Sequence, residues 1–391
     1  MIDPKSLTRH YTRFRVTERI LLTGHSHQAW PDSGFEGQSR AWMDAAELVD
    51  DKWERAFAMA GAVRRGFARL LHDEADQIAL GASTHELLVR FLSGLPLKKQ
   101  RRLVTTDGEF HSLRRQVDRL GEEGIAIVRV PAHPVASLSE RIRKEVTSDT
   151  AAVLLSAVLF ETAEIVPGLG SLANACRGAG VELLVDAYHA LNVIPFPLPN
   201  LGLSSAYVLG GGYKYCQMGE GNCFLRFPSD TTMRPVITGW YSEFEQLESK
   251  AAGKVQYGSG PARFAGSTYD PTSHYRGAEV FRFFSDQQIT PERLRELSKR
   301  QISRLAHGFD ELVLDPKVIT RVVHGLDGIA GFLALRAPDA AGLAKSLRAK
   351  GVYADSRHDI LRLGPAPYVT DEQLDQALKA LGEAVRETHA P

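Results

Sequence analysis

The chain has 391 residues, of which 43% are hydrophobic and 24% charged, so it is long enough to bury a large core in two or three structural units. Lys plus Arg and Asp plus Glu both total 47, so no net field attracts nucleic acid or an anionic membrane surface, and we expect neither as a partner. The N-terminal residues are too polar for a secretory signal, and no stretch approaches the ~20 consecutive apolar residues of a membrane span. We therefore expect a cytoplasmic protein. The three cysteines, Cys176, Cys216 and Cys223, lack the spacing of a disulfide framework or a zinc site, so no metal is expected.

The first two thirds of the chain predict alternating helices and strands. Residues Phe35–Leu71 have apolar side chains at helical spacing without proline, which predicts one or two long helices. Short apolar runs and amphipathic segments then alternate. The expected strands are Gln77–Leu80, Leu103–Thr105, Ile125–Val130, Ala151–Phe160, Val181–Val185, Ala206–Leu209 and Cys223–Phe227, and the expected helices between them are Glu86–Leu95, Ser112–Leu120, Leu138–Val146 and Ser171–Gly178. Unbroken apolar strands are buried on both faces, so we expect an α/β fold with a mainly parallel sheet between helices.

The last third changes character and predicts a smaller α+β domain. Helices are expected near Arg276–Phe284 and Pro291–His307, and strands at Val318–Val323, Ala330–Leu335 and Leu361–Leu363. The segment Tyr257–Gly266 is rich in Gly, Pro and Ser, which favours a connection over a regular element. We therefore divide the chain into an N-terminal segment (1–50), a large α/β domain (51–256) and a small C-terminal domain (257–391).

A carboxylate follows the expected strand Val181–Val185 directly. In open α/β sheets, ligands bind where the strands end at their carboxyl edge, and Asp186 stands at such an end with His189 three residues later. An Asp there can hold a protonated pyridine nitrogen, because its charge stabilises the ring cation. A helix cap or a loop acid is the commoner role of an Asp in this position.

A lysine follows the next expected strand after three glycines. Glycines let the backbone approach a ligand closely, and they deliver Lys214 between Tyr213 and Tyr215. A lysine that is partly desolvated has a lowered pKa, and its free amine can form an imine. A solvated lysine after a flexible turn is the rival interpretation, and the order strand, Asp186, strand, glycines, Lys214 favours the imine.

Small hydroxylated residues open the helix after the first expected strand. The N-terminal amides and dipole of such a helix make an anion site, to which Ser83 and Thr84 add hydroxyl donors. An ordinary N-cap, in which the hydroxyl accepts from the first-turn amides, is the rival interpretation.

Taken together, these segments resemble the class V pyridoxal-phosphate (PLP) enzymes, and within that class kynureninase. The stretch from Asp186 to Pro195 resembles the D-x-x-H-A pattern of that family, and Tyr213-Lys214-Tyr215 matches its Y-K-Y. The stretch from Asp355 to Tyr368 resembles its D-x-R-x(4)-R-x-x-P-x-P-L-Y motif. The similarity runs in the same order from about residue 20 to residue 380. It implies the PLP-dependent transferase fold of type I, with a mainly parallel, seven-stranded-type sheet between helices and a smaller C-terminal domain.

The resemblance also implies roles for individual residues. Lys214 would carry PLP as a Schiff base, Asp186 would pair with the ring nitrogen, and His189 would lie near the ring hydroxyl. Ser83 and Thr84 would hold the phosphate, and Phe110, which follows a strand, would stack on the ring, with a plain core position as the rival for Phe110. The segments around Trp240 and Arg263–Thr268 resemble those that reach the phosphate across a dimer interface, so Trp240, Ser267 and Thr268 would come from the partner of a homodimer with shared active sites. Arg362 would bind the carboxylate of an amino-acid substrate through its planar fork of donors.

The implied activity is a PLP-dependent hydrolysis of the Cβ–Cγ bond of kynurenine or a related amino acid, which gives alanine and an anthranilate-type product, with Tyr213 as acid or base. A class V aminotransferase or another PLP-dependent lyase needs the same Lys214 and Asp186, and a non-catalytic PLP-binding protein is a further alternative. A cysteine desulfurase is disfavoured because no cysteine follows Cys223.

Three segments depart from the kynureninase pattern, and all three would shape the substrate pocket. They are Thr23–Pro31, Thr162-Ala163 and Gln217–Gly221. The first contains His25 and His27, which alternate on one segment without a third ligand, so a pocket role is favoured over a metal. We assign His25 to the substrate pocket.

Overall fold

A seven-stranded sheet forms the centre of the computed structural model, which describes residues 2–249 and 253–388. The strand order is β2 (Ile78–Gly81), β8 (Cys223–Arg226), β7 (Tyr207–Gly211), β6 (Glu182–Asp186), β5 (Thr150–Ser156), β3 (Arg102–Thr106) and β4 (Ala126–Val130). The pairs from β7 to β4 are parallel, and β8 runs antiparallel to both of its neighbours. The expected α/β class with a mainly parallel sheet is confirmed.

Helices cover both faces of this sheet because its strands are apolar on both sides. In β5 every residue is buried, and alternate side chains enter two different cores: Val153 and Leu155 belong to one, Ala152 and Leu154 to the other. The helices that follow the strands are α4 (Thr84–Gly94), α5 (His111–Glu122), α6 (Leu138–Lys144), α7 (Leu169–Gly178) and α8 (Leu198–Leu201), with 3₁₀ turns at Ala75–Gln77 (η4) and Val135–Ser137 (η5). Strand, helix and strand alternate as the sequence predicts.

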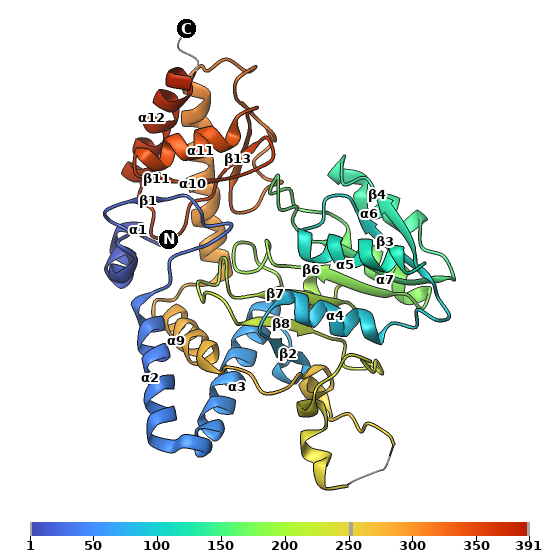
Figure 1. The fold of residues 1–391 in the computed structure, drawn as a ribbon. Coiled ribbons are helices and arrows are strands. Elements are labelled where there is room, and N and C mark those ends of the chain that lie inside the picture. Colours follow the sequence, from blue (N-terminus) through green and yellow to red (C-terminus); the bar gives the residue numbers. More distant parts are fainter. Residues whose placement is uncertain (1, 250–252, 389–391) are drawn as a thin grey trace.

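The expected helical stretch Phe35–Leu71 forms two helices that pack against a helix from much later in the chain. They are α2 (Asp32–Leu48) and α3 (Lys52–Leu71), separated by the 3₁₀ turn η3 (Val49–Asp51), and their partner is α9 (Thr272–Asp286). Figure 1 shows the three helices side by side next to the sheet. Glycine permits the close approach of α3 and α9, since a Cβ on Gly66 would lie 2.1 Å from the ring of Phe281.

The C-terminal part forms the smaller α+β unit that the sequence predicts. Its four-stranded sheet has the order β12 (Asp355–Arg357), β13 (Ile360–Leu363), β10 (Leu333–Arg336) and β9 (Thr320–Arg321), and its helices are α10 (Pro291–Glu311), α11 (Ala340–Ala349) and α12 (Asp371–Thr388). The expected strand at Val318–Val323 is shorter, because a turn in which the amides of Val318 and Ile319 donate to Asp315 precedes it. Figure 1 places this unit, in orange and red, on one side of the large sheet.

The N-terminal residues contact the C-terminal unit directly. After α1 (Pro4–Leu7) and two 3₁₀ turns, η1 (Thr8–His10) and η2 (Thr12–Phe14), strand β1 (Ile20–Leu21) pairs in parallel with β11 (Val352–Tyr353). An isolated bridge continues this contact between Thr23 and Gly364. The segment around His25 is thereby fixed beside strand β13.

The connection expected at Tyr257–Gly266 is anchored to the large sheet. It contains the 3₁₀ helix η7 (Gly260–Phe264), which follows a longer one, η6 (Trp240–Ser249). Phe264 is fully buried, with its ring 5.1 Å from that of Phe227 and 6.3 Å from that of Tyr207. This burial gives a Gly- and Pro-rich segment a fixed place, while the proposed domain boundaries stay predictions.

Within the described ranges, no helix combines the length and the apolar character that a membrane crossing needs.

Candidate active site

Four of the predicted site residues follow strands that end at the same edge of the sheet. Strands β2, β3, β6 and β7 run in one direction, and Ser83, Phe110, Asp186 and Lys214 follow their carboxyl ends. The start of β8 closes this edge, because Cys223 pairs with both Gly81 and Gly211. The topology therefore gathers residues that are up to 131 positions apart in the sequence (83 to 214) at the place where open α/β sheets bind ligands.

The amine of Lys214 is buried among aromatic rings. Its Nζ lies 5.3 Å from the ring centroid of Phe110 and 5.1 Å from that of Tyr188, and it hydrogen-bonds His189 Nε2. Burial lowers the pKa of Lys214 to about 7, Asp186 opposes this shift, and Arg362 adds to it. A large part of the amine is therefore uncharged at neutral pH, as imine formation requires.

Asp186 is the counter-charge of this lysine. Burial raises the pKa of Asp186, whereas the Tyr188 amide and the positive charge of Lys214 oppose that rise. The Tyr188 N–H donates to Oδ1 at 2.8 Å. One carboxylate oxygen is thus fixed by the backbone, and Asp186 and Lys214 lie close enough to influence each other's ionisation.

His189 presents a buried ring nitrogen without a partner. Burial and the positive charge of Lys214 lower the pKa of His189 well below its ordinary value, so the ring is neutral. If Nε2 accepts from Lys214, the proton of the neutral ring sits on Nδ1, which has no hydrogen-bond partner among the described residues. A buried donor of this kind fits a bound group that carries an acceptor oxygen.

The helix α4 begins beside this cluster. Ser83 is its N-cap, and the Ser83 hydroxyl accepts from the Glu86 amide at 3.2 Å. The Thr84 amide interacts with the Cys223 thiol at the start of β8. The capping role of Ser83 is therefore present in this structure, and its exposed position at the N-terminus of an eleven-residue helix also suits an anion.

Arg362 lies in a buried cluster with Asp355 and His25. Its Nε and Nη2 donate to the two carboxylate oxygens of Asp355 at 3.0 and 2.6 Å, and Nη1 donates to the Phe160 carbonyl at 2.7 Å. Asp355 also bonds His25 Nε2 at 2.7 Å. Burial raises the pKa of Asp355, but its bonds to His25 and Arg362 prevail and hold that pKa well below its ordinary range.

Arg362 and His25, the two predicted substrate residues, thus both contact Asp355 in the structure. Arg362 directs its planar fork at Asp355, so a substrate carboxylate would meet an arginine that is already oriented by a carboxylate. His25 is completely buried behind Asp355, and burial lowers its pKa to about 4, so it is a neutral support of Asp355. The sequence offered one signal for this partnership, since Asp355 and Arg362 belong to the same C-terminal motif.

Tyr213 stands at the more open side of the cluster. Its ring lies 5.3 Å from that of His27, on the segment that departs from the kynureninase pattern. Partial burial and the charge of Glu220 raise the pKa of Tyr213, so its phenol stays protonated at neutral pH. At a second departure, Ala163 has a φ of 66°, a conformation that favours glycine.

The three residues expected from a partner subunit lie in η6 and just after η7. Trp240, Ser267 and Thr268 are exposed, and Trp240 contacts the rings of Tyr241 and Phe244. Gly239 packs against Gly266 and the Ser267 amide. No interaction described for these three side chains reaches Lys214.

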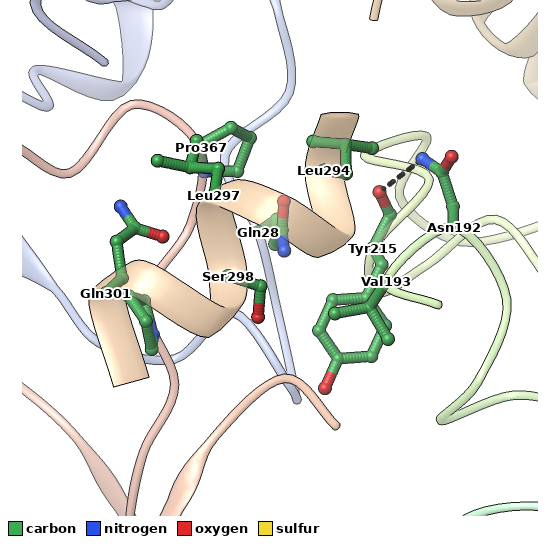
Figure 2. Close-up of a pocket in the computed structure, with 10 residues that line it drawn as sticks. Gln28, Asn192, Val193, Tyr215, Leu294, Leu297, Ser298, Gln301 and Pro367 are labelled. Atoms are coloured by element: carbon green, nitrogen blue, oxygen red, sulfur yellow. Dashed lines mark hydrogen bonds between the residues drawn. The ribbon is translucent and has the colours of Figure 1, made fainter. Parts of the chain in front are cut away.

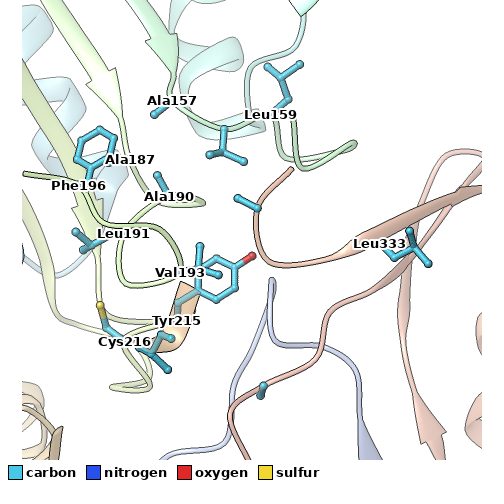
Figure 3. Close-up of a cluster of buried hydrophobic side chains, with 14 of the residues drawn as sticks. Ala157, Leu159, Ala187, Ala190, Leu191, Val193, Phe196, Tyr215, Cys216 and Leu333 are labelled. Atoms are coloured by element: carbon cyan, nitrogen blue, oxygen red, sulfur yellow. The ribbon is translucent and has the colours of Figure 1, made fainter. Parts of the chain in front are cut away.

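Beneath the cluster, apolar packing joins the large sheet to the C-terminal unit. Figure 3 shows residues that follow β5, β6 and β7, among them Ala157, Ala187 and Tyr215, which belong to the same buried cluster as Leu333 of β10. Figure 2 shows Asn192 Nδ2 donating to the Tyr215 carbonyl beside α10.

The residues drawn in Figure 2 line a cavity of about 20 Å³, which is too small for a cofactor. A larger one of about 420 Å³ is lined by α3, α9 and the loop at Pro195–Pro197, and none of the predicted site residues line it.

Two side chains of the cluster were not assigned a role from the sequence. Tyr188 lies over the Lys214 amine, and Glu109 is a buried carboxyl that follows β3. Glu109 follows the end of β3 by three residues, after Asp107 and Gly108, so its sequence signal was weaker than that of Asp186, which ends β6. Within the described residues, no group of three or more His, Cys, Asp or Glu side chains is placed to hold a metal ion.

The residues fit a PLP cofactor. A partly buried lysine with a lowered pKa, a carboxylate that interacts with it, a buried histidine with an unpartnered nitrogen and a helix N-terminus lie at one sheet edge. These groups match the aldehyde, ring nitrogen, ring hydroxyl and phosphate of PLP in chemistry.

No protein-family model matches the chain. Among curated proteins, it is 23% identical to the uncharacterized aminotransferase YcbU of Bacillus subtilis, a match that covers 86% of this chain and 87% of that protein. It is 24% identical to a kynureninase of Bacillus cereus, in a match that covers 95% of this chain and 85% of that protein. It is 22% identical to the cysteine desulfurase IscS of Rickettsia akari, and here the match covers 84% and 80%.

Solved structures with the same fold include PLP-binding proteins. A C-DES variant with glycine covalently linked to its PLP cofactor matches with a TM-score of 0.85 at 16% identity, covering 96% of this chain and 98% of that one. A cysteine desulfurase from Thermococcus onnurineus NA1 matches with a TM-score of 0.84 at 17% identity, covering 99% of both chains. The chain therefore has the type I fold of these proteins, and the expected fold is confirmed.

The Asp355 cluster predicts a stability effect. Asp355→Asn leaves the buried Arg362 guanidinium without its counter-charge, so we expect a loss of about 3 kcal/mol in the free energy of unfolding. Asp359→Asn on the same hairpin is the matched control, because its pair with Arg336 is exposed and should contribute less than about 1 kcal/mol. Urea unfolding measures both. Equal, small effects in the two variants would contradict a supporting role of Asp355.

Proposed function

We propose that this protein is a PLP-dependent enzyme that acts on an amino acid, with Lys214 as the cofactor lysine. The observation that carries the proposal is the buried Lys214, whose pKa is lowered to about 7, next to Asp186 at the ends of the adjacent strands β6 and β7. The confirmed fold and the PLP-bound proteins that share it support the same assignment. A cytoplasmic location is part of this proposal.

PLP, when bound, supplies an electron sink that stabilises negative charge at the α-carbon of an attached amino acid. Asp186 would hold the ring nitrogen through the carboxylate oxygen that the Tyr188 amide does not occupy. Ser83, Thr84 and the N-terminus of α4 would hold the phosphate, and Phe110 would stack on the ring. His189 would donate from Nδ1 to an oxygen of the ring.

Lys214 would move the α-proton. Its amine is uncharged in part at neutral pH, so Nζ can accept a proton at the α-carbon and later return it. The rings of Phe110 and Tyr188 flank this amine at 5.3 and 5.1 Å and partly shield it from water. Arg362, which Asp355 holds in a fixed orientation, would bind the substrate carboxylate through the N–H groups that Asp355 and Phe160 leave free.

The reaction that we propose is the hydrolysis of the Cβ–Cγ bond of kynurenine or a close analogue. Water adds to the γ-carbonyl, the Cβ–Cγ bond breaks, and the products are alanine and an anthranilate-type acid. Tyr213 would act as the acid at the γ-carbonyl oxygen, because its raised pKa keeps the phenol protonated. The match to curated kynureninases over 95% of this chain supports this choice.

Persulfide chemistry of the desulfurase type receives less support from the cysteines. All three are buried, and burial raises the pKa of Cys176 and of Cys223 to about 12 and that of Cys216 further. None is a ready thiolate nucleophile. Aminotransferases and C–S lyases that need no cysteine nucleophile stay as the alternatives.

We also propose a homodimer. Large apolar side chains are exposed on α2 and η6, including Trp42 at 79%, Met43 at 63% and Phe244 at 49%. The rings of Trp53 and Tyr241, 6.4 Å apart, connect α3 to η6, and Figure 1 shows both segments on the same side of the molecule. An exposed apolar surface of this kind favours association. Trp240, Ser267 and Thr268 would then reach the partner's site.

The lysine assignment predicts a pH-dependent attachment of PLP. Because only the uncharged amine reacts, the rate at which the apoprotein acquires its visible absorbance should rise as pH passes through about 7 and then level off. Lys214→Ala should remove this absorbance, whereas Lys299→Ala, at an exposed lysine, should keep it. An unchanged spectrum in the Lys214 variant would contradict the assignment.

Substrate turnover separates the reactions. The PLP-loaded protein is incubated with kynurenine, 3-hydroxykynurenine, cysteine, cystine, or alanine plus a keto acid, and the products are identified by mass spectrometry. We expect alanine and an anthranilate from the first two. If only cysteine or cystine reacts, and the product is sulfide or persulfide, the activity is C–S cleavage and the proposed hydrolysis is wrong. A loaded protein that converts none of these compounds would indicate a non-catalytic role.

The dimer predicts a mass of two chains in solution. Trp42→Glu places a charge in the proposed interface and should shift the mass measured by sedimentation toward one chain. Val313→Glu is the control, since Val313 is 87% exposed on the C-terminal unit and should leave the mass unchanged. A monomeric wild-type protein would refute the dimer.

A further inference from the structure

Glu109 is a buried carboxyl at the same sheet edge as Asp186, and the proposed reaction does not use it. It follows β3 and is only 3% exposed. Strands β3 and β6 both flank β5, whose last residue, Ser156, pairs in register with Asp186. The Ala157 amide extends this contact by donating to the Asp186 carbonyl at 2.8 Å. Glu109 and Asp186 are thus joined through the end of one strand.

The hydrogen bonds of Glu109 define which oxygen can hold a proton. The Thr106 hydroxyl accepts from the Gly108 amide, so its own hydrogen is free to donate to Glu109 Oε1 at 2.6 Å. The Ser156 amide also donates to Oε1, at 3.2 Å. Oε1 therefore has two fixed donors and remains an acceptor.

The second oxygen, Oε2, contacts a hydroxyl group that can act either as a donor or as an acceptor. Glu109 Oε2 lies 2.6 Å from the Ser156 hydroxyl, which can either donate a hydrogen bond or accept one. An ionised Glu109 accepts from this hydroxyl, and a protonated Glu109 donates to it from Oε2. The network therefore gives each oxygen of the carboxyl a hydrogen-bond partner in both charge states.

The surrounding charges decide which of the two carboxyls is ionised. Besides burial, Asp186 on β6 is the charged group that raises the pKa of Glu109, while β3 and β5 contribute the hydroxyls of Thr106 and Ser156 and the Ser156 amide. Asp186 has in addition the Lys214 amine after β7, whose positive charge favours its ionised form. Two negative charges at one buried edge repel each other, and the carboxyl with a cation takes the single charge.

We propose that Glu109 is a positioning residue for Asp186: it holds a proton on Oε2 and thereby leaves the single negative charge of this edge on Asp186, where the ring nitrogen of PLP would bind. The proposal rests on the proposed PLP function. Burial raises the pKa of Glu109 to about 7, and the charge of Asp186 adds to that rise, which agrees with a proton that is held at neutral pH and released above it.

As a consequence, the ionisation of Glu109 should fall in the physiological pH range and should affect the bound cofactor. Below about pH 7, Glu109 is neutral and Asp186 carries the one charge. Above it, Glu109 ionises, and a second negative charge appears near Asp186. The added charge strengthens proton binding at the ring nitrogen, so the electronic state of the ring should change as Glu109 titrates.

Glu109→Gln tests this inference. Its amide oxygen can accept from Thr106 and from the Ser156 amide, and its NH₂ can donate to the Ser156 hydroxyl, so it mimics the protonated acid at all pH values. The readout is the nitrogen NMR shift of ¹⁵N-labelled PLP in the loaded protein, followed across pH. We expect an inflection near pH 7 in the wild type and its loss in Glu109→Gln, which should keep the wild-type low-pH shift.

Glu182→Gln is the matched control, because Glu182 lies on β6 at the opposite end from Asp186 and burial raises its pKa as well. This variant should keep the wild-type inflection. An inflection that persists in Glu109→Gln, or that is lost in Glu182→Gln, would overturn the inference. A purely structural role of Glu109 would change stability without removing one titration step.

Carboxyl infrared spectra of the apoprotein separate this inference from the PLP proposal. A protonated carboxyl that disappears as pH rises through about 7, and that is missing in Glu109→Gln, would support the held proton even if PLP did not bind. Failure to bind PLP would refute only the proposed function, whereas identical apoprotein titrations in the two proteins would refute the role of Glu109.

Discussion

The buried pairing of Lys214 with Asp186 is the constraint on which the rest of the site depends. Removing either charge from water costs on the order of several kcal/mol, so both groups can stay buried only if each stabilises the other or gives up its charge. The chain does both: burial lowers the pKa of Lys214 to about 7, and the Tyr188 amide supports the Asp186 carboxylate. A lysine in this state exchanges between a charged form that pairs with Asp186 and an uncharged form that is a nucleophile.

The neighbouring side chains follow from that pairing. A second cation next to Lys214 would be unfavourable, and the two buried histidines of the region, His25 and His189, are neutral for this reason and because of burial. Arg362 keeps its charge because Asp355 meets its fork directly. Glu109 lacks a cation of its own and therefore becomes the group that holds a proton. In this region, Arg362 is thus paired with Asp355 and Lys214 with Asp186, while His189 and Glu109, which lack a counter-charge, are uncharged.

The sequence predicted the sheet from local patterns and placed Asp186 and Lys214 at its edge, whereas the roles of these two residues came from the resemblance and stay predictions. Unbroken apolar runs such as Ala151–Phe160 indicate strands buried on both faces, and a polar residue at the end of each such run marks the sheet edge. Asp355 and Arg362 lie in one motif and pair across the hairpin of β12 and β13, but their contact with His25 could not be predicted, because it depends on β1 joining β11 across more than three hundred residues. The two-residue strands β1, β9 and β11 carry too little periodicity to be recognised. Glu109 shows a weaker strand-end signal than Asp186, and its role depends on Ser156, on a strand that is its neighbour only in the folded sheet.

Chemical trapping at the lysine tests the central claim most directly. Reduction of the PLP-loaded protein with borohydride fixes any imine as a stable amine, and peptide mapping by mass spectrometry then identifies the modified residue. The account predicts a single pyridoxyl group on the peptide that contains Lys214, with the other lysines unmodified. A label on a different lysine, or no label in a protein that binds PLP, would contradict it.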